Sequence, residues 1–125
     1  MAGRWLFMLV TSLSVGALLL AACAAPEKAA APIEGAPEIK VVAREFSFGP
    51  AEIRVKAGEP VNVVYVNEGA EFHDFVITGL DFRLNADPGV EVVGGLAVEE
   101  PGTYEFICSV DDHKDQGMVG TLVVE

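Results

Sequence analysis

From Glu38 to the end of the chain, apolar and polar residues alternate with a period of two, which is the pattern of half-buried β-strands. We predict strands in six runs: IKVVAREFSF, AEIRVKAG, PVNVVYVNEG, HDFVITGL, TYEFICSV and MVGTLVVE. The first run is expected to form one strand with Phe46 and Phe48 on the same face. Turn signals rich in glycine, proline and acidic residues separate the runs. Short strands at this spacing predict an all-β protein, an antiparallel β-sandwich or barrel.

Residues 38–125 are expected to form one small domain with a modest core, which a bound metal would stabilise further. Within it, residues 79–99 give no clear pattern and are compatible with a loop, a short helix or an irregular strand.

Residues 1–22 have the organisation of a secretory signal peptide, with Arg4 followed by an apolar run and then small residues. The apolar run is short for a transmembrane helix, which needs about 20 residues, although an uncleaved membrane anchor is an alternative. The sequence LAAC that ends at Cys23 resembles the lipobox of bacterial lipoproteins, in which the cysteine becomes the lipidated first residue.

Residues 23–37 are therefore expected to be a lipidated cysteine and a linker rich in alanine, proline and glutamate. This organisation predicts a domain held outside the cytoplasm by a lipid anchor in a bacterial membrane.

The chain is acidic, with 8 basic and 19 acidic side chains and a net charge of −11. Removing Arg4 with the signal peptide gives −11 − 1 = −12. Such a charge argues against nucleic acid as a partner, because that binding depends on clusters of Lys and Arg. It favours a positively charged protein partner, or serves solubility alone.

The chain has two cysteines, and a lipid on Cys23 would leave Cys108 without a disulfide partner. A Cys23–Cys108 disulfide is the alternative. A lone thiol in an exported protein is either an inert core residue or a metal ligand. Strand alternation places Cys108 on an inward face with two aromatic residues, and His73 on a face with Phe75 and Ile77. Taken singly, a buried His, Cys or Met is commonly part of the core.

Together these residues indicate a metal site. After the signal peptide, the chain keeps two His, one Met and Cys108, and three of them follow the spacing C-x4-H-x4-M at Cys108, His113 and Met118. His73 begins a strand directly after a turn-rich segment, where it can meet that loop. Two imidazoles and a thiolate, with a weak axial thioether, describe an electron-transfer copper site.

The segments FSFGPAEIRVKAGEPV, HDFVI and GTYEFICSVDDHKDQGMVGTLVVE resemble the cupredoxins, small blue-copper proteins of the plastocyanin and azurin type. The resemblance spans residues 38–125 and implies a Greek-key β-sandwich with one type 1 copper ion. By position, it implies His73, Cys108 and His113 as strong ligands and Met118 as the axial ligand. It also implies that His113 lies near the surface in an apolar patch and serves as the electron port.

Two positions depart from the family pattern. Many members have Pro-Gly before the loop histidine, where this chain has Asp111–Asp112, and members often have Asn after the first histidine, where this chain has Asp74. An ionised Asp accepts hydrogen bonds but donates none. The surroundings of the ligands, and therefore the reduction potential, are expected to differ from those of the family.

The expected function is that of a monomeric, membrane-anchored copper protein that passes single electrons between redox partners and is not an enzyme. Asp111, Asp112 and Asp115 flank His113 and are either a solvated polar loop or a docking surface for a cationic partner such as a basic cytochrome. The alternative function is a copper chaperone or store. A zinc-binding or structural sandwich is a further alternative.

Overall fold

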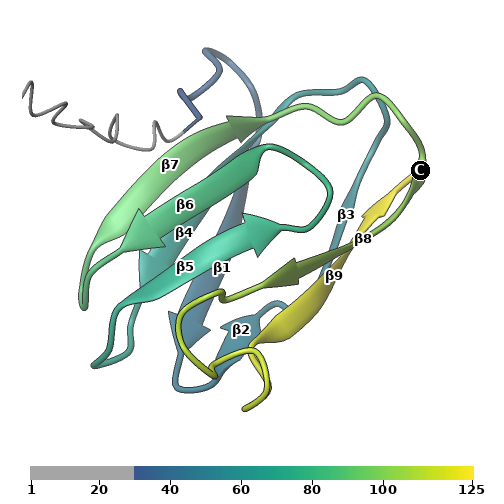
Figure 1. Cartoon of the computed structure of the whole chain (residues 1–125). Coiled ribbons are helices and arrows are strands. Elements are labelled where there is room, and N and C mark those ends of the chain that lie inside the picture. The colour runs from purple at the N-terminus through teal and green to yellow at the C-terminus, as the bar shows by residue number, and fades with distance from the viewer. Residues whose placement is uncertain (1–29) are drawn as a thin grey trace, which may run out of the picture.

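The computed structural model describes residues 30–125, and every regular element in this part of the chain is a β-strand (Figure 1). The all-β fold expected from the sequence is confirmed. The strands are β1 (Glu38–Arg44), β2 (Ser47–Gly49), β3 (Glu52–Val55), β4 (Val61–Asn67), β5 (His73–Ile77), β6 (Phe82–Ala86), β7 (Glu91–Leu96), β8 (Gly102–Ile107) and β9 (Val119–Val124).

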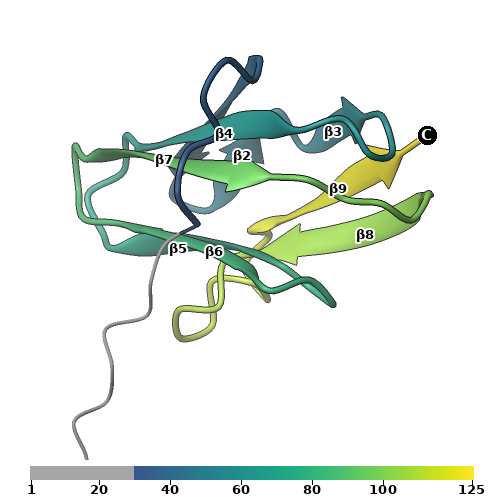
Figure 2. The same cartoon turned by 90° about the horizontal axis from the view of Figure 1, so that it is seen from above.

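Two sheets pack face to face, as the view from above in Figure 2 shows. The first sheet has the strand order β2-β1-β4-β7, and the second has the order β3-β9-β8-β5-β6. The β-sandwich is confirmed, but it is not antiparallel throughout. The pairs β1–β4 and β3–β9 are parallel. In each pair, the chain passes through the other sheet between the first strand and the second.

The core lies between the sheets and is dominated by aromatic rings. The Phe48 ring meets the Phe75 and Phe106 rings edge-on, with centroids 5.7 and 5.5 Å away, and the Phe75 and Phe106 rings lie 4.9 Å apart. Tyr65 of β4 packs on Phe75 at 5.8 Å. Aromatic pairs at these separations contribute about 0.5–1.5 kcal/mol each beyond their buried area. Through Phe75, this cluster packs β5, the strand that begins with His73, against the first sheet.

The first predicted strand is two strands. The chain turns at Glu45–Phe46, and β2 folds back antiparallel on β1 with Ala43 opposite Phe48. The apolar and polar residues keep alternating in the sequence across this turn, but the extended backbone is interrupted there. Phe46 and Phe48 therefore do not share a strand face. Phe48 enters the core, while the Phe46 ring lies 5.0 Å from the ring of His113.

The segment 79–99, whose sequence was ambiguous, contains β6 and β7 joined by a turn. β6 pairs with β5 and β7 pairs with β4, so this connection crosses from one sheet to the other. β6 alternates over only five residues, and β7 contains Gly94 and Gly95, so neither strand gives a long two-residue period in the sequence.

Residues 30–37 lie against the first sheet. The side chain of Asn62 accepts from the N–H of Ile33 and donates to its carbonyl, both at 2.8 Å, and the N–H of Gly95 donates to the carbonyl of Ala31 at 3.2 Å. A Cβ at Gly95 would lie 2.6 Å from that carbonyl oxygen, so the close approach requires glycine. This part of the expected linker is packed on the domain.

The expected signal peptide, 1–22, and Cys23, the expected site of lipidation, lie outside the described residues. Within 30–125, no helix is long and apolar enough to cross a membrane.

Candidate metal centre

The loop of residues 108–118 closes one end of the sandwich, at the bottom of Figure 1 beside β2. Backbone hydrogen bonds shape it, and three of them involve the ligand positions. The N–H of Cys108 donates to the carbonyl of Met118 at 3.1 Å, the N–H of His113 to that of Val110 at 3.0 Å, and the N–H of Met118 to that of His113 at 3.0 Å. The backbone therefore holds the three sequence-predicted loop residues next to one another before any metal is considered.

The structure brings the two predicted histidines and the predicted cysteine together. His73 Nδ1 and His113 Nδ1 are 3.1 Å apart, and the Cys108 Sγ lies 3.9 Å from the first and 3.5 Å from the second. These atoms all lie within 4.8 Å of one another. All three side chains are buried, with exposed fractions of 0% for His73 and Cys108 and 3% for His113.

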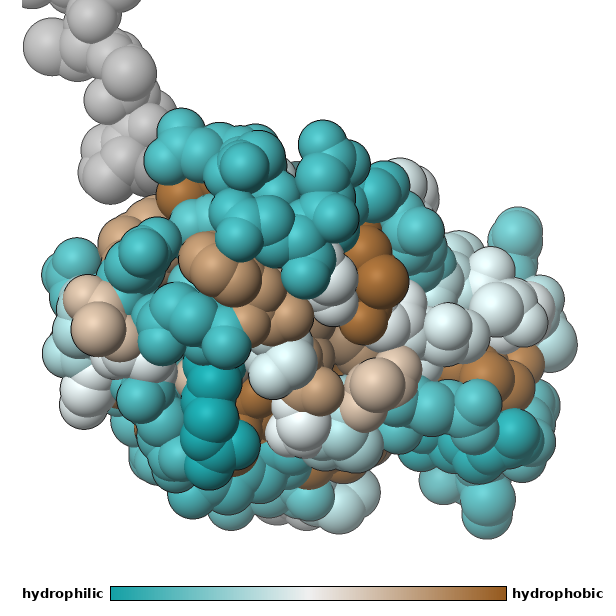
Figure 3. Space-filling view, turned by 90° about the horizontal axis from the view of Figure 1, so that it is seen from below, coloured by the Kyte–Doolittle hydropathy of each residue, from teal (hydrophilic) through white to brown (hydrophobic). Residues whose placement is uncertain are grey.

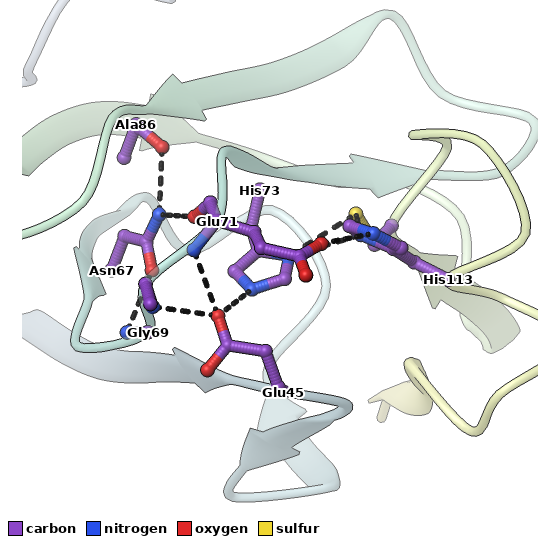
Figure 4. A network of polar contacts seen from close by, with 9 residues as sticks. Glu45, Asn67, Gly69, Glu71, His73, Ala86 and His113 are labelled. Atoms are coloured by element: carbon purple, nitrogen blue, oxygen red, sulfur yellow. Dashed lines mark hydrogen bonds and ion pairs between the residues drawn. The ribbon is translucent and has the colours of Figure 1, made fainter.

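The outer nitrogens of both imidazoles face carboxylates (Figure 4). His73 Nε2 is 3.0 Å from Oε1 of Glu45, and His113 Nε2 is 3.0 Å from Oε2 of Glu71. A carboxylate accepts hydrogen bonds, so each neutral ring carries its proton on Nε2 and leaves a lone pair on Nδ1. Two lone pairs and a sulfur then converge in a buried space, an arrangement that a cation between them stabilises.

The size of this space fits a single metal ion. A first-row metal ion bonded to imidazole nitrogen at ~2.0 Å and to thiolate at ~2.3 Å holds such atoms ~3.3–3.8 Å apart. The observed separations of 3.1, 3.5 and 3.9 Å lie around that range. A donor set of two imidazoles and one thiolate, with a thioether nearby, suits copper.

Cys108 sits in a position that keeps its thiol neutral without a metal. Burial raises the pKa of the thiol, and backbone hydrogen bonds from Asp74 and Val110 oppose that rise by favouring the thiolate. Cys108 is a free thiol, and Cys23, the partner in the alternative disulfide, lies outside the described residues. A bound cation would supply the positive charge that a buried thiolate needs.

Met118 is the fourth predicted ligand, and its side chain is completely buried at 0% exposure. Its backbone carbonyl and N–H bond to Cys108 and His113, so its Cα lies beside both ligands. Its role as axial ligand stays a prediction.

His113 is 3% exposed and lies just beneath the surface, and its implied role as the electron port stays a prediction. The carboxylate of Glu71 covers its Nε2, and the ring of Phe46 lies 5.0 Å from its ring. The side chain of Glu71 is itself 55% exposed, so it lies between His113 and solvent.

Both departures from the family pattern are accommodated. Asp74 is buried, and its two carboxylate oxygens accept from the N–H and the hydroxyl of Ser109, so only acceptors are needed there. Asp111 has a φ of +42°, in a region that Asp and Asn enter more readily than most residues. Asp112 accepts from the backbone and side chain of Gln116 at 3.1 and 3.0 Å, which closes the loop.

The three predicted docking residues, Asp111, Asp112 and Asp115, are exposed and take no part in the metal cluster. Figure 3 looks at the end of the sandwich seen from below, where patches of apolar surface are surrounded by hydrophilic residues. Phe72, next to His73, is 41% exposed, the largest exposed fraction among the large apolar side chains of residues 30–125.

Sequence reasoning missed the partners of the imidazoles. Glu71 carries a weak signal, because a residue two positions before His73 points to the same side of an extended chain. Glu45 carries none, because it is 28 positions from His73 and reaches it only through the turn between β1 and β2.

The comparisons with known proteins agree with this geometry. A family model described as a cupredoxin-like domain matches residues 13–124. A copper-resistant cuproprotein, CopI of Rubrivivax gelatinosus, is 33% identical over 104 aligned residues, which cover 67% of this chain and 63% of that protein. The chain therefore spans less than two thirds of the length of this relative.

Among solved structures, the fold is similar to two auracyanins. The dithionite-reduced auracyanin of Roseiflexus castenholzii has a TM-score of 0.65 and 22% identity, covering 73% of this chain and 99% of that one. Auracyanin A of Chloroflexus aurantiacus, described as a blue copper protein, has a TM-score of 0.63 and 21% identity, covering 73% and 100%. At these identities the likeness establishes the fold.

Proposed function

Since the chain belongs to the family of cupredoxin-like domains, we propose that it carries single electrons through one type 1 copper ion. His73, Cys108 and His113 are the strong ligands and Met118 is the weak axial ligand. The observation that carries the proposal is the convergence of two imidazole lone pairs and a buried sulfur, with both outer nitrogens held by carboxylates. In a sandwich that binds no metal, burying three electron-pair donors against one another would cost free energy without a compensating interaction.

When bound, copper supplies a Cu(I)/Cu(II) couple, for which thiolate and thioether favour the reduced state and imidazole suits the oxidised state. The chain contributes rigidity. The loop of residues 108–118 is closed by its own backbone bonds, and Asp74 ties its first residues to β5. Ligands fixed in this way move little when the charge of the ion changes, which keeps the cost of electron transfer low. We propose no substrate turnover, because protein donors take all four positions.

We propose further that the domain works outside the cytoplasm, anchored by lipid on Cys23. Its redox partner is a cationic protein, for example a basic cytochrome, that approaches the end of the sandwich where Asp111, Asp112 and Asp115 are exposed. Glu71 adds a fourth carboxylate beside His113. These charges support the proposal because they surround the ligand nearest to solvent.

A copper-handling role is the second candidate, favoured by the 33% identity to CopI, a copper-resistant cuproprotein. Buried donors argue for slow exchange of the ion and therefore for an electron carrier. Mixing the copper-loaded protein with a competing metal-free acceptor separates the two, since transfer within seconds indicates copper handling.

Visible absorption and electron paramagnetic resonance of the Cu(II)-loaded protein test the proposed site. An intense charge-transfer band with small copper hyperfine splitting is expected, and it should disappear in Cys108→Ser while the fold is retained. Reduction should bleach the band, and reoxidation should restore it. A weak spectrum typical of nitrogen and oxygen ligation would overturn the type 1 assignment.

A further inference from the structure

The carboxylate of Glu45 occupies a site built for it beneath His73 (Figure 4). Its Oε1 accepts from the N–H of Ala70 at 2.7 Å, the N–H of Glu71 at 2.9 Å and Nε2 of His73 at 3.0 Å. Hydrogen bonds to an ionised carboxylate are stronger than those between neutral groups. Two backbone N–H groups and an imidazole N–H therefore converge on one carboxylate oxygen, a set of donors that stabilises the ionised form.

The loop that faces Glu45 is shaped to admit the carboxylate. A Cβ on Gly69 would lie 2.2 Å from Oε1 of Glu45, so the observed position of the carboxylate requires glycine there. The side chain of Asn67 fixes the loop: it accepts from the N–H of Gly69 at 2.9 Å and donates to the carbonyls of Glu71 and Ala86 at 2.7 and 2.9 Å. The donors that hold Glu45 are therefore in place independently of the metal.

The second carboxylate differs from the first. Glu71 meets Nε2 of His113 at 3.0 Å, but its side chain is 55% exposed and His113 is its one side-chain partner given by the structure. The side chain of Glu45 is 31% exposed and has two backbone donors besides His73. The carboxylate beside His73 is therefore held by more hydrogen bonds and is less exposed than the carboxylate beside His113.

We propose that Glu45 is a positioning residue of the metal centre that sets the tautomer of His73 and favours Cu(II) over Cu(I). By accepting the Nε2 proton, it directs the Nδ1 lone pair of His73 toward Cys108 and His113. Its fixed negative charge makes the imidazole a stronger donor, as carboxylate partners of ligating histidines do. A negative charge near the ion stabilises its more highly charged state, so the reduction potential is lowered. This inference rests on the proposed copper site and names Glu45 as a residue that sets its reduction potential.

The test compares reduction potentials of the copper-loaded wild type and three single variants. Glu45→Gln keeps the shape of the side chain and removes its charge. In this variant the ratio of the Cu(II) affinity to the Cu(I) affinity should fall about tenfold, the lower end of the range for residues that hydrogen-bond to metal ligands. A tenfold change corresponds to ~59 mV for one electron, here a rise in potential. Gly69→Ala leaves Glu45 intact but forces its carboxylate away, so the potential should move in the same direction.

Glu68→Gln is the matched control. It removes one negative charge from the same loop, at a side chain that pairs with Arg44 and not with a ligand. Its potential should stay close to that of the wild type. Equal potentials in Glu45→Gln, Gly69→Ala and Glu68→Gln, each with an unchanged visible band, would overturn the proposed role of Glu45.

A second measurement needs no copper. Imidazole nitrogen NMR of the metal-free protein should show the proton of His73 on Nε2, and Glu45→Ala should abolish that preference. A wild-type protein with the proton on Nδ1 would refute the inference whatever the metal does. Absence of a type 1 spectrum in the wild type would instead refute the proposed function and leave the NMR result to decide the role of Glu45.

Discussion

Asp74 on β5 and Ser109, the residue after Cys108, are joined by two hydrogen bonds, one from the Ser109 N–H at 2.6 Å and one from its hydroxyl. These bonds connect the strand that carries one ligand to the loop that carries the others. Arg83, which is partly exposed, lies beside this pair, with its guanidinium 3.8 Å from the Asp74 carboxylate and 3.3 Å from the Ser109 hydroxyl. The chain therefore uses an acceptor-only side chain, supported by a cation, to hold the two sides of the site together.

Replacing Asp74 should loosen this connection. Asp74→Ala leaves the N–H and hydroxyl of Ser109 without their acceptor, and we expect a loss of about 1–3 kcal/mol in the free energy of unfolding of the metal-free protein. Asp74→Asn keeps one acceptor oxygen and should lose less. Urea unfolding followed by circular dichroism measures both. An Asp74→Ala protein as stable as the wild type would contradict a structural role for this pair.

The strands that form the core were largely predictable from the sequence, because a two-residue apolar period is the pattern of a strand with one buried and one exposed face. The failure at Glu45–Phe46 has the same cause. Apolar and polar residues alternate through this turn, and no Gly or Pro at these two positions marks the reversal of chain direction. Only the packing of Phe48 in the core and of Phe46 on His113 fixes the break.

Adding a methyl group at Gly120 should destabilise the core. A Cβ there would lie 2.1 Å from two ring atoms of Phe106, which is completely buried, and 2.7 Å from the backbone oxygen of Ala51. Neither neighbour can move away freely, so Gly120→Ala should cost about 1–3 kcal/mol of unfolding free energy, the usual range for overpacking. The urea midpoint measures it. Gly49→Ala, where the Cβ meets nothing within 4 Å, is the control and should change the midpoint little.

The cluster of His73, Cys108 and His113 was predictable because His, Cys and Met are scarce in this chain and their spacing is short. Their hydrogen-bond partners were not, since Glu45 and Glu71 are two among many acidic residues. What distinguishes Glu45 is a set of backbone N–H groups from a loop 25 or more positions away, which appears only when the chain is folded. The burial of His113 likewise depends on Glu71 and Phe46, neither of which is in the ligand loop.

Copper should stabilise the folded protein. Free copper at one hundred times its dissociation constant adds about 2.7 kcal/mol if the unfolded chain does not bind it, so the thermal midpoint should rise on loading. Cys108→Ser removes the thiolate and should lose most of this increment. Because each variant is compared with its own metal-free form by scanning calorimetry, any effect of the substitution on the fold cancels. An equal increment in both proteins would exclude Cys108 as a ligand.

The packed segment 30–37 should depend on Asn62. This side chain makes two hydrogen bonds of 2.8 Å to Ile33 and is 7% exposed. Asn62→Ala should release the segment and make it more sensitive to a protease, as seen by mass spectrometry of the fragments. Asn62 is the second residue of β4, and the opposite end of that strand reaches Asn67 beside the site, so the visible spectrum should not change. Unchanged cleavage would mean that other contacts hold the segment.

The exposed acidic residues of the ligand loop should control the rate of electron transfer with charged partners. Asp111, Asp112 and Asp115 flank His113, and Lys114, the basic residue between them, is engaged by Glu105 at 2.7 Å. The loop therefore presents negative charge that attracts cations over about a Debye length, ~10 Å at 0.1 M salt. Oxidation of the reduced protein by the cation tris(phenanthroline)cobalt(III) should slow as salt increases, whereas oxidation by the anion ferricyanide should accelerate.

Changing the three aspartates to asparagine should weaken both salt effects and slow the reaction with the cation at low salt several-fold, since steering changes association rates by 10-fold or more. The control is the triple change of Glu59, Glu99 and Glu100 to glutamine. Glu100 precedes β8, whose far end leads into Cys108, so the control removes equal charge from the opposite end of the sandwich. Equal losses in the two triple variants would show that net charge, and not a docking surface at the ligand loop, governs the approach of the partner.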